Sequence, residues 1–427
     1  MTEFKKYKLG DICDLNKNSL KVSDTFDTIE YLDTSSITEN TIDSFQNFSR
    51  EDAPSRAQRK VQNETIIFST VRPNQNHFGL IQNPKTNLIV SSGFTTLDVK
   101  DKIEFDAKYL YYNLTQPSVV NFLQTLAQNS VSAYPSINPD DIGNLYLRFP
   151  EVSTQKKIAS VLSNIDRKIS VNREINRNLE ELAKQIYDYW FVQFDFPNEE
   201  GKPYKSSGGK MVWNESLKRK IPADWEVKNV VDVIEPIERG ISYTSDDIKS
   251  NKGIPMLNLA CYDKQGEYRS GEMKFFSGKC TDRVYPFEMF IACTDMTQNA
   301  DIIGRPIFAP TEYNEYVYSM DLAKITPKLI SKMYLYYTLR TSFYHTYIKP
   351  FASGTNVKHL NIYGIERYPL YIPSGDIQKR FKERIRPIKI KQQKCLQEIQ
   401  ELTELRDSLL PLLMNGQVTL NSCLSAD

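Results

Sequence analysis

The stretch INPDDIGNLYLRFPEVSTQKKIASVLSNIDRKI (residues 137–169) occurs twice in this chain, in diverged form. Its second copy, LNIYGIERYPLYIPSGDIQKRFKERIRPIKIKQ (residues 360–392), lies 223 residues further on, and the two copies align without a gap. The identical pairs at this shift include Asn138/Asn361, Ile142/Ile365, Leu147/Leu370, Pro150/Pro373, Gln155/Gln378 and Lys156/Lys379. Because the apolar positions coincide as well, chance does not explain the match, and the sequence indicates a long internal repeat.

The end of each copy has the heptad pattern of a long packed helix. In the first copy, alternating steps of four and three residues give Ile158, Leu162, Ile165, Ile169, Asn172, Asn176, Leu179, Ala183, Ile186 and Trp190. The equivalent positions in the second copy are Phe381, Ile385, Ile388, Gln392, Cys395, Ile399, Leu402, Arg406, Leu409 and Leu413. Both series carry polar residues near the middle, which costs stability in a helix pair but can fix its register and direction.

These two patterns predict long helices that pack on each other as an antiparallel coiled coil. The first, over residues 153–191, would be roughly 58 Å long at about 1.5 Å per residue. That length is typical of a spacer. Pro387 lies inside the second pattern, where a proline should kink the helix or make its first turn begin late.

The repeat also extends towards the start of each copy. YKLGDICDL (residues 7–15) aligns with WEVKNVVDV (residues 225–233) at a shift of 218, which places Asp14 on Asp232. This alignment keeps an aromatic first residue and the apolar positions.

Between these segments, each copy has the pattern of a mixed α and β domain. The runs ETIIFSTVR (residues 64–72) and EMFIACTD (residues 288–295) predict strands that lie between polar, turn-rich stretches. YLYYNL (residues 109–114) and YLYYTL (residues 334–339) begin short helices. We expect their aromatic faces to be core rather than a platform for a ligand.

The predicted fold class is therefore α+β, with two similar mixed domains joined by two long antiparallel helices and related by a pseudo-two-fold internal repeat. The segment between the copies is polar and rich in Gly, Ser, Pro and Lys, so it predicts a linker with few apolar anchors. The predicted boundaries are 1–150 for the N-terminal domain, 151–193 for the first spacer helix, 194–224 for the linker, 225–373 for the C-terminal domain, 374–416 for the second spacer helix and 417–427 for a frayed tail.

Composition excludes several classes of protein. The chain has 427 residues, 54 basic against 53 acidic side chains and a net charge of +1, so bulk charge would not make it coat nucleic acid. The six cysteines form no CxxC pair and predict reduced thiols, while only three histidines are available for metal sites. No apolar run reaches the ~18 residues of a membrane span, and we expect a cytoplasmic protein.

Catalytic motifs are missing from the sequence. It has no GxGxxG, no GxxxxGK[ST] and no GxSxG, which are needed to cradle phosphates or to present a serine nucleophile. Residues 138–141 read NPDD and depart after two positions from the [DN]PP[YF] motif of adenine methylation. Residues 226–228 read EVK, but we interpret this possible nuclease ExK as an exposed strand edge.

What remains are polar side chains of the kinds that read base edges, since Asn and Gln pair with adenine and Arg and Lys with guanine. The first group of candidates follows the predicted strand in each copy: Arg72, Asn74, Gln75, Asn76 and His77, then Asp295, Thr297, Gln298 and Asn299. Gln75 and Asn76 match Gln298 and Asn299 at the shift of 223. These amides could equally cap a turn, and both interpretations stay open.

A second pair of loops precedes the repeated Ile/Leu-Asn step. Its candidates are Ser130, Ser132 and Tyr134 in the first copy and Thr355, Asn356, Lys358 and His359 in the second. Ordinary exposed turns are the alternative. Arg50, Arg56, Arg59 and Lys60 form a basic run that would suit contacts with phosphates, although such a run is usually a solvated surface.

Taken together, these residues resemble the specificity (S) subunits of type I restriction-modification systems over nearly the whole chain. The resemblance rests on the duplication and on SGTNVKHLNI (353–362), YPLYIPSGDIQKRF (368–381), LRFPEVSTQKKIASVLSNIDRKI (147–169), WFVQFDFPNEEGKPYKSSGG (190–209) and RDSLLPLLMNGQV (406–418). The first copy departs from the SGT pattern and has QNSVSAYPSI (128–137) instead.

The resemblance implies a non-catalytic DNA reader, in which each mixed domain is a target-recognition domain for one half of a bipartite site in double-stranded DNA. It also implies that the helices set the half-site spacing and dock two modification (methyltransferase) subunits. S-adenosylmethionine, ATP and Mg are then expected on the methyltransferase and restriction subunits, and no cofactor or metal on this chain. The alternatives are a self-sufficient DNA methyltransferase or nuclease, and a protein-only coiled-coil adaptor.

Overall fold

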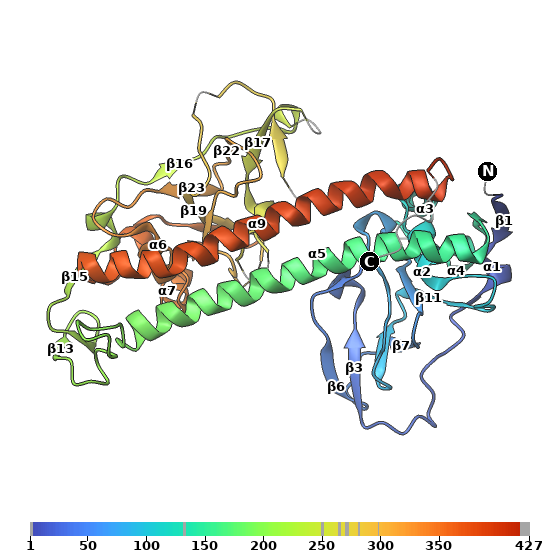
Figure 1. The fold of residues 1–427 in the computed structure, drawn as a ribbon, viewed down its shortest axis with the longest axis horizontal. Coiled ribbons are helices and arrows are strands. Elements are labelled where there is room, and N and C mark those ends of the chain that lie inside the picture. Colours follow the sequence, from blue (N-terminus) through green and yellow to red (C-terminus); the bar gives the residue numbers. More distant parts are fainter. Residues whose placement is uncertain are drawn as a thin grey trace, which may run out of the picture. The chain divides into compact units, whose positions relative to one another are not determined.

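The computed structural model describes residues 3–130, 134–248, 252–263, 266–269, 273–280, 282–297 and 299–418. The chain divides into two compact units, and each combines β-sheets with helices (Figure 1). Unit 1 contains Met1–Lys168 and Leu402–Asp427, and unit 2 contains Ile169–Glu401. The two long helices, α5 (Val152–Tyr187) and α9 (Gly375–Met414), each contribute residues to both units.

Unit 1 contains two four-stranded sheets and several short helices. Its strands pair in the orders β2-β11-β8-β9 and β6-β3-β10-β7, with further pairs β1-β12 and β4-β5. The elements are β1 (Lys5–Lys8), α1 (Leu9–Ile12), β2 (Cys13–Leu15), β3 (Thr28–Leu32), β4 (Ile37–Thr38), β5 (Thr41–Ile42), β6 (Gln46–Ser49), β7 (Ala57–Lys60), β8 (Ile66–Ser69), β9 (Phe78–Leu80), β10 (Leu88–Ser91), β11 (Phe94–Val99), α2 (Ala107–Leu114), α3 (Pro117–Gln128), α4 (Pro139–Gly143) and β12 (Tyr146–Phe149).

Unit 2 repeats this plan. Its sheets have the orders β16-β23-β19-β21, β18-β17-β22 and β20-β25-β24, with pairs β15-β26 and β13-β14. The elements are β13 (Met211–Asn214), β14 (Arg219–Pro222), β15 (Glu226–Asn229), β16 (Glu238–Arg239), β17 (Ile254–Leu257), β18 (Lys274–Phe276), β19 (Met289–Ala292), β20 (Thr294–Asp295), β21 (Pro306–Phe308), β22 (Val317–Tyr318), β23 (Leu322–Ile325), α6 (Lys332–Thr338), α7 (Ser342–Ile348), β24 (Ala352–Ser353), β25 (Lys358–Leu360), α8 (Tyr363–Glu366) and β26 (Pro369–Ile372). The predicted α+β class and the duplication are confirmed.

The identical glutamines of the repeat have the same structural task in both units. The side-chain amide of Gln155 donates to Pro150 O (2.8 Å) and its oxygen accepts from Asp106 N (2.9 Å). Gln378 makes the equivalent bonds to Pro373 O (2.7 Å) and from Ser331 N (2.7 Å). Both side chains are buried, so losing them would leave backbone groups unpaired. Each glutamine therefore joins the start of a long helix to its domain.

The alignment at the start of the copies is wrong by three residues. In the structure β1 pairs with β12 so that Lys5 faces Phe149, and β15 pairs with β26 so that Glu226 faces Ile372. Since residues 149 and 372 differ by 223, the two strands correspond at a shift of 221, not 218. The predicted match of Asp14 with Asp232 came from one shared residue type in a short alternating segment, which carries too little information to fix a register.

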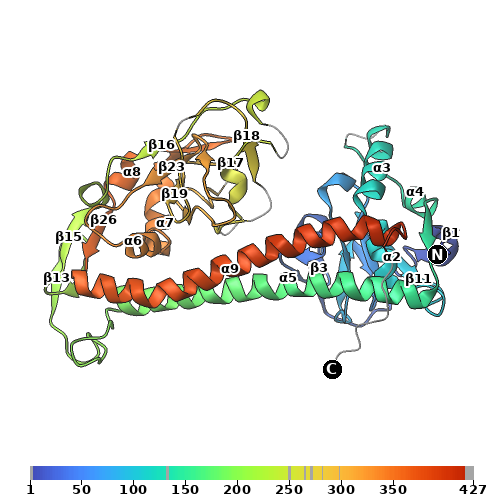
Figure 2. The same ribbon diagram turned by 45° about the horizontal axis from the view of Figure 1, so that its top comes forward.

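The long helices are confirmed and pack side by side (Figure 2). In unit 2 the Gln392 amide donates to Asn176 O (3.1 Å), and the rings of Tyr187 and Phe381 are 6.0 Å apart. In unit 1 Arg406 Nη1 lies 3.1 Å from Asp166 Oδ1. Position numbers rise along one helix as they fall along the other, so the packing is antiparallel as predicted.

Pro387 does not delay the second helix, and that part of the prediction is wrong. Helix α9 begins at Gly375 and continues through Pro387 to Met414. Pro387 is exposed. The backbone group that loses its hydrogen-bond partner therefore lies on the solvent side of the helix, where the loss costs least.

Residues 194–224 are not a linker with few apolar anchors. Phe194, Phe196 and Ile221 are buried in the core of unit 2, and β13 and β14 form a hairpin. The ring of Phe196 stacks on Tyr204 at 4.7 Å and on Trp225 at 5.2 Å. The average polarity of the segment hid these few aromatic anchors, which suffice to fix it.

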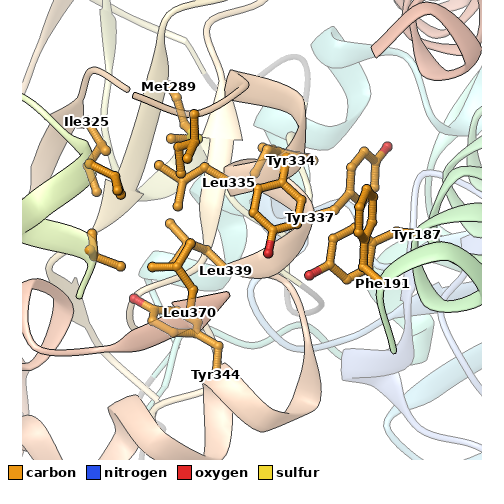
Figure 3. Packing of buried hydrophobic residues seen from close by; sticks show 14 of the residues in the cluster. Tyr187, Phe191, Met289, Ile325, Tyr334, Leu335, Tyr337, Leu339, Tyr344 and Leu370 are labelled. Carbon is orange, nitrogen blue, oxygen red and sulfur yellow. The ribbon is translucent and has the colours of Figure 1, made fainter. Parts of the chain in front are cut away.

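The aromatic faces of the two YLYY helices are core, as predicted. In α6 both Tyr334 and Tyr337 are buried, and they pack against Tyr187 and Phe191 from α5 and the residues that follow it (Figure 3). Tyr334 also donates its hydroxyl to Tyr371 O (2.6 Å). In unit 1 the hydroxyl of Tyr109 donates to Arg148 O in the same way (3.1 Å).

Candidate nucleic-acid interface

In unit 1 the structure brings the two predicted loops of the first copy together. Val71 and Ser136 form an isolated antiparallel bridge. Arg72 N donates to Pro135 O (2.9 Å), and Ile137 N donates to Thr70 O (2.9 Å). We call this site the first edge: residues 72–77 together with residues 130 and 134–136.

Unit 2 has the same junction at the shift of 223. Thr294 in β20 pairs with His359 in β25, and Leu360 N donates to Cys293 O (2.8 Å). We call this site the second edge: residues 294–297 and 299 together with residues 353–359. In each copy the two paired residues lie 65 positions apart in the sequence, and the duplication has kept this backbone pairing.

The loop of the first edge is held by some of its own candidate side chains. Arg72 (φ 48°) and Asn76 (φ 55°) have left-handed backbone conformations on either side of a short turn. The Asn76 amide donates to Glu39 Oε1 (2.9 Å), and His77 Nδ1 lies 2.6 Å from Ile37 O. Asn76 and His77 therefore shape the turn.

The other three side chains of this loop face solvent. Arg72, Asn74 and Gln75 are exposed, and Asn74 uses only its backbone N–H, which donates to Gln124 Oε1 (3.2 Å). The guanidinium of Arg72 lies over the ring of Tyr134, 5.1 Å from its centre.

The remaining candidates of the first edge are two serines. Ser130 accepts a hydrogen bond from Ser136 N (3.4 Å). Ser132 lies outside the described residues.

The loop of the second edge is organised by a carboxylate. Asp295 is fully buried, and its oxygens accept from Thr297 N (2.7 Å) and Ile302 N (2.8 Å). The Thr297 hydroxyl accepts from Asp301 N (3.0 Å), so this side chain also supports the loop. Asn299 is exposed, and Gln298 lies outside the described residues.

The hairpin of the second edge presents the remaining candidates. Thr355, Asn356 and His359 are exposed, and Lys358 donates to Gly354 O (2.7 Å). Gly354 has φ 120°, and a Cβ there would lie 2.0 Å from Val357 O, so only glycine fits this tight turn.

The predicted phosphate-binding run does not form one cluster. The Arg50 guanidinium donates to the backbone carbonyls of residues 21, 22 and 24. Lys60 lies 2.6 Å from Asp24, and this hydrogen bond lowers the pKa of the Asp24 carboxyl. Arg59 is half-buried in β7, which leaves Arg56 as the exposed member. Two of the four basic side chains, Arg50 and Lys60, therefore hold the loop at residues 21–24 in place.

The weak catalytic motifs have structural tasks. Asn138 caps helix α4, and its N–H donates to Asp141 Oδ2 (2.7 Å). Glu226 is exposed on strand β15, 3.3 Å from Lys228. Within the part of the chain that the structure describes, no group of three His, Cys, Asp or Glu side chains could hold a metal ion.

The same described part has no helix long and apolar enough to cross a membrane. Its cysteines at positions 13, 261, 280, 293 and 395 are thiols that are not joined in disulfides.

Sequence reasoning missed several residues that support these edges. Glu39 binds Asn76 from a distant turn, and Gln124 binds the backbone of Asn74 from α3. Asp295 was among the candidates from the sequence, but its buried side chain supports the loop instead of facing a ligand. A weak signal existed only for Glu39, because the sequence EN at residues 39 and 40 is typical of a turn with left-handed residues.

The duplicated mixed domains and the pair of long helices are the architecture expected of a type I restriction-modification specificity subunit, and comparisons with known proteins place the chain in that class. A family model described as "Type I restriction modification DNA specificity domain" matches residues 1–181 and 222–403. The chain belongs to this family and is the DNA specificity subunit of a type I restriction-modification system, not its catalytic part.

Its relatives agree over most of their length. The HindI specificity subunit of Haemophilus influenzae is 24% identical over 98% of this chain and 100% of the relative. The MjaIX specificity subunit of Methanocaldococcus jannaschii is 24% identical over 83% of this chain and 77% of the relative. The crystal structure of an S subunit from M. genitalium has a TM-score of 0.52 at 16% identity and 96% coverage of both chains, which indicates a common fold.

Proposed function

We propose that each unit reads one half of a bipartite site in double-stranded DNA through its edge. The observation that carries this proposal is the repeated junction: Val71 pairs with Ser136, and Thr294 pairs with His359 at the same shift. The backbone frame is shared, whereas the exposed side chains differ. A shared frame with different side chains is what two readers of different sequences need, because base edges are distinguished by donor and acceptor patterns.

The exposed candidates are the ones we propose as base contacts. They are Arg72, Asn74 and Gln75 in the first edge and Asn299, Thr355, Asn356 and His359 in the second. The half-buried Lys358 is a further candidate of the second edge, and Tyr134 supports the guanidinium of Arg72 in the first. Ser130, Ser132, Gln298 and Thr297 complete the candidate set, with Asn76 and His77 as supports of the loop. Among Arg50, Arg56, Arg59 and Lys60, Arg56 is the candidate for a phosphate contact.

We also propose that α5 and α9 set the distance between the half-sites and dock two modification (methyltransferase) subunits. Support comes from the length of the helices, 36 and 40 residues, and from the antiparallel polar contacts between them. S-adenosylmethionine would then be bound by these partners, and ATP and Mg by restriction subunits. The near-neutral charge of this chain fits partners that supply much of the contact with phosphates.

The decisive experiment maps methylated adenines in DNA from cells that carry this chain with its modification partner. The expected result is two short specific half-sites with a fixed unspecific gap. Replacing Asn356 by Ala should relax only one half-site, and replacing Gln75 by Ala should relax only the other, each by ~1–3 kcal/mol per lost bidentate contact. A single undivided target would contradict the proposal.

The role of the helices is tested by length. Four residues inserted into α5 and four into α9 at the facing position add ~6 Å at about 1.5 Å per residue, which is just under two base pairs at ~3.4 Å each. The gap should lengthen while both half-sites stay the same. An equal number of residues inserted into the exposed loop at residues 198–202 is the control and should leave the gap unchanged.

A further inference from the structure

The first edge presents an arginine that is oriented but not neutralised. Arg72 is exposed, its guanidinium lies 5.1 Å from the centre of the Tyr134 ring, and no carboxylate pairs with it among the described residues. Its backbone is in the left-handed region at φ 48°, and its N–H is bonded to Pro135 O (2.9 Å). Both the start and the end of this side chain are therefore positioned.

Arg50, in the same unit, is an arginine with a structural role, and its contacts can be compared with those of Arg72. It too lies over an aromatic ring, that of Phe26, at 5.7 Å. However, its donors are bonded to the backbone carbonyls of residues 21, 22 and 24. The donors of Arg72 have no acceptor within the described ranges, so the stacking on Tyr134 holds a guanidinium whose hydrogen bonds are still to be made.

A stacked guanidinium is suited to one kind of partner. Stacking on a ring restricts the orientation of the planar guanidinium. Less conformational entropy is then lost when the guanidinium binds an acceptor. A planar fork matches the O6 and N7 acceptors of guanine in the major groove, which is the commonest specific contact between a side chain and a base. Phosphate is the other acceptor for such a fork, but it carries no sequence information.

The second edge has no arginine at the position equivalent to Arg72. The residue equivalent to Arg72 is Asp295, whose carboxylate is buried and capped by Thr297 N and Ile302 N. The cation of the second edge is Lys358, which comes from the opposite strand and donates to Gly354 O (2.7 Å). A lysine presents a point charge without a planar fork.

We propose that Arg72, held on the ring of Tyr134, selects a guanine in the half-site read by the first edge. This inference rests on the proposed function of that edge. Tyr134 acts as the positioning residue, and Arg72 makes the base contact.

The test uses the complex of this chain with its modification partner and measures binding and methylation for DNA in which each position of the site is changed in turn. For the unaltered complex, one position of one half-site should be a guanine whose replacement weakens binding by roughly 10- to 100-fold. Arg72→Ala should abolish the preference at that position only. Arg72→Lys should lose most of it although the charge stays.

Variants of Tyr134 test the orientation of the Arg72 guanidinium separately from its contact with the base. Tyr134→Leu removes the ring and should reduce the preference at the same position, whereas Tyr134→Phe keeps the ring and should preserve it. Lys358→Ala is the matched control, because it should act on the other half-site alone. Tyr134 is 60% exposed, so thermal unfolding should show that these variants still fold.

Two results would overturn the inference. If Arg72→Ala weakens all sequences alike and reduces the dependence of log K on log salt by about 1, Arg72 contacts a phosphate. If no position responds to Arg72, it contacts no DNA. Either result leaves the bipartite site of the unaltered complex in place, so it is distinguishable from failure of the proposed function, in which the unaltered complex reads no divided site.

Discussion

The two units secure the helix pair with opposite arrangements of charge at equivalent positions. In unit 1 the first cluster consists of Asp166 on α5, Arg406 on α9 and the hydroxyl of Tyr112, which donates to Asp166 (2.5 Å). In unit 2 the position equivalent to Asp166 is Lys389, and it lies over the ring of Tyr337, the equivalent of Tyr112, at 5.2 Å. The acid has become a base.

The residue of opposite charge also lies on the other long helix in each unit, but at a position that is not equivalent. In unit 2 Lys389 pairs with Glu180 on α5 at 2.6 Å, and Glu180 also faces Arg340 (3.5 Å) and accepts from Gln392 (3.2 Å). We call Glu180, Lys389, Arg340 and Gln392 the second cluster. A duplicated chain starts with two identical helix ends. The inverted charges make each end specific for its own partner segment, because a wrong pairing would bring like charges together.

Burial separates the two clusters. The side chains of Glu180 and Lys389 are 14% and 8% exposed, whereas those of Asp166 and Arg406 are 25% and 20% exposed. Removing one member of a buried pair leaves an uncompensated charge, which costs more than the same change near water. The comparison therefore predicts unequal effects of equal substitutions.

The largest effect is expected for Glu180→Ala, because it leaves Lys389 buried without its ion-pair partner. It also removes one of the two carboxylates that pair with Arg340, the other being that of Glu267. The free energy of unfolding of unit 2 should fall by about 3–5 kcal/mol. All three tryptophans, at positions 190, 213 and 225, lie in unit 2, so urea unfolding followed by tryptophan fluorescence reports this unit. A loss below about 1 kcal/mol on Glu180→Ala, which is typical of an exposed ion pair, would show that the cluster is solvated.

Acid should weaken unit 2 through the same carboxyl. Burial alone would raise the pKa of Glu180, but the charges of Lys389 and Arg340 outweigh it and hold this pKa below the usual value of 4.5. A lowered pKa in the folded state means that the stabilisation is present above about pH 4.5 and is lost as the pH falls towards the folded pKa. We expect a loss on the order of 2 kcal/mol.

The control for this pH effect is Glu180→Gln. Glutamine cannot titrate, so the variant should be less stable at neutral pH but should have a flatter dependence of unfolding free energy on pH below 4.5. The measurement is urea unfolding at a series of pH values. Parallel curves for the variant and the unaltered chain would exclude Glu180 as the source of the slope.

The first cluster should give a smaller coupling. A double-mutant cycle with Asp166→Ala and Arg406→Ala should give an interaction energy of about 1 kcal/mol, because both side chains are partly exposed and their attraction is screened. Unit 1 has no tryptophan, so far-ultraviolet circular dichroism or hydrogen exchange of residues 152–168 is the measurement. If this coupling equals that of Glu180 with Lys389, burial is not what separates the clusters.

The duplication and the long helices could be predicted from the sequence, because a repeat with heptads is a pattern of many residues. Gln155 and Gln378 stood out as identities, although their buried bonds to Pro150 and Pro373 needed the structure. Arg406 falls on the predicted apolar series, yet it is an ion-pair residue. Periodicity predicts which face of a helix is packed against a neighbour, but not which charged residues on that face form ion pairs.

The candidate edges could be predicted only as loops. The sequence placed residues 72–77 and 130–134 in separate segments, and their pairing depends on Val71 and Ser136, which carry no unusual pattern. The same holds for Arg50 and Lys60, whose partners near residue 24 lie 26 and 36 positions away. Tertiary hydrogen bonds of this kind decide which polar side chains stay available, and no local pattern records them.

The smallest effect concerns a row of hydrogen-bonded polar groups in unit 2 that leads to the loop of the second edge. Arg305 donates to Arg340 O (3.4 Å) and lies 3.1 Å from His345 Nδ1, and His345 Nε2 lies 3.3 Å from Ala300 O in the loop of the second edge. At the shift of 225 that relates the YLYY helices, the residue in place of His345 is Val120, which cannot titrate.

Burial, together with the charges of Arg305 and Lys349, lowers the pKa of His345 to about 4. Because the unfolded ring binds its proton near pH 6.5, unfolding becomes easier as the pH falls from 6.5 towards 4, by about 1 kcal/mol once the screening of a half-exposed ring is allowed for. Hydrogen exchange of residues 296–301 should therefore speed up between pH 6.5 and 5 beyond the intrinsic rate change, while residues 72–77 should not respond. His345→Gln should remove the difference, and a response of both edges would mean that another group titrates.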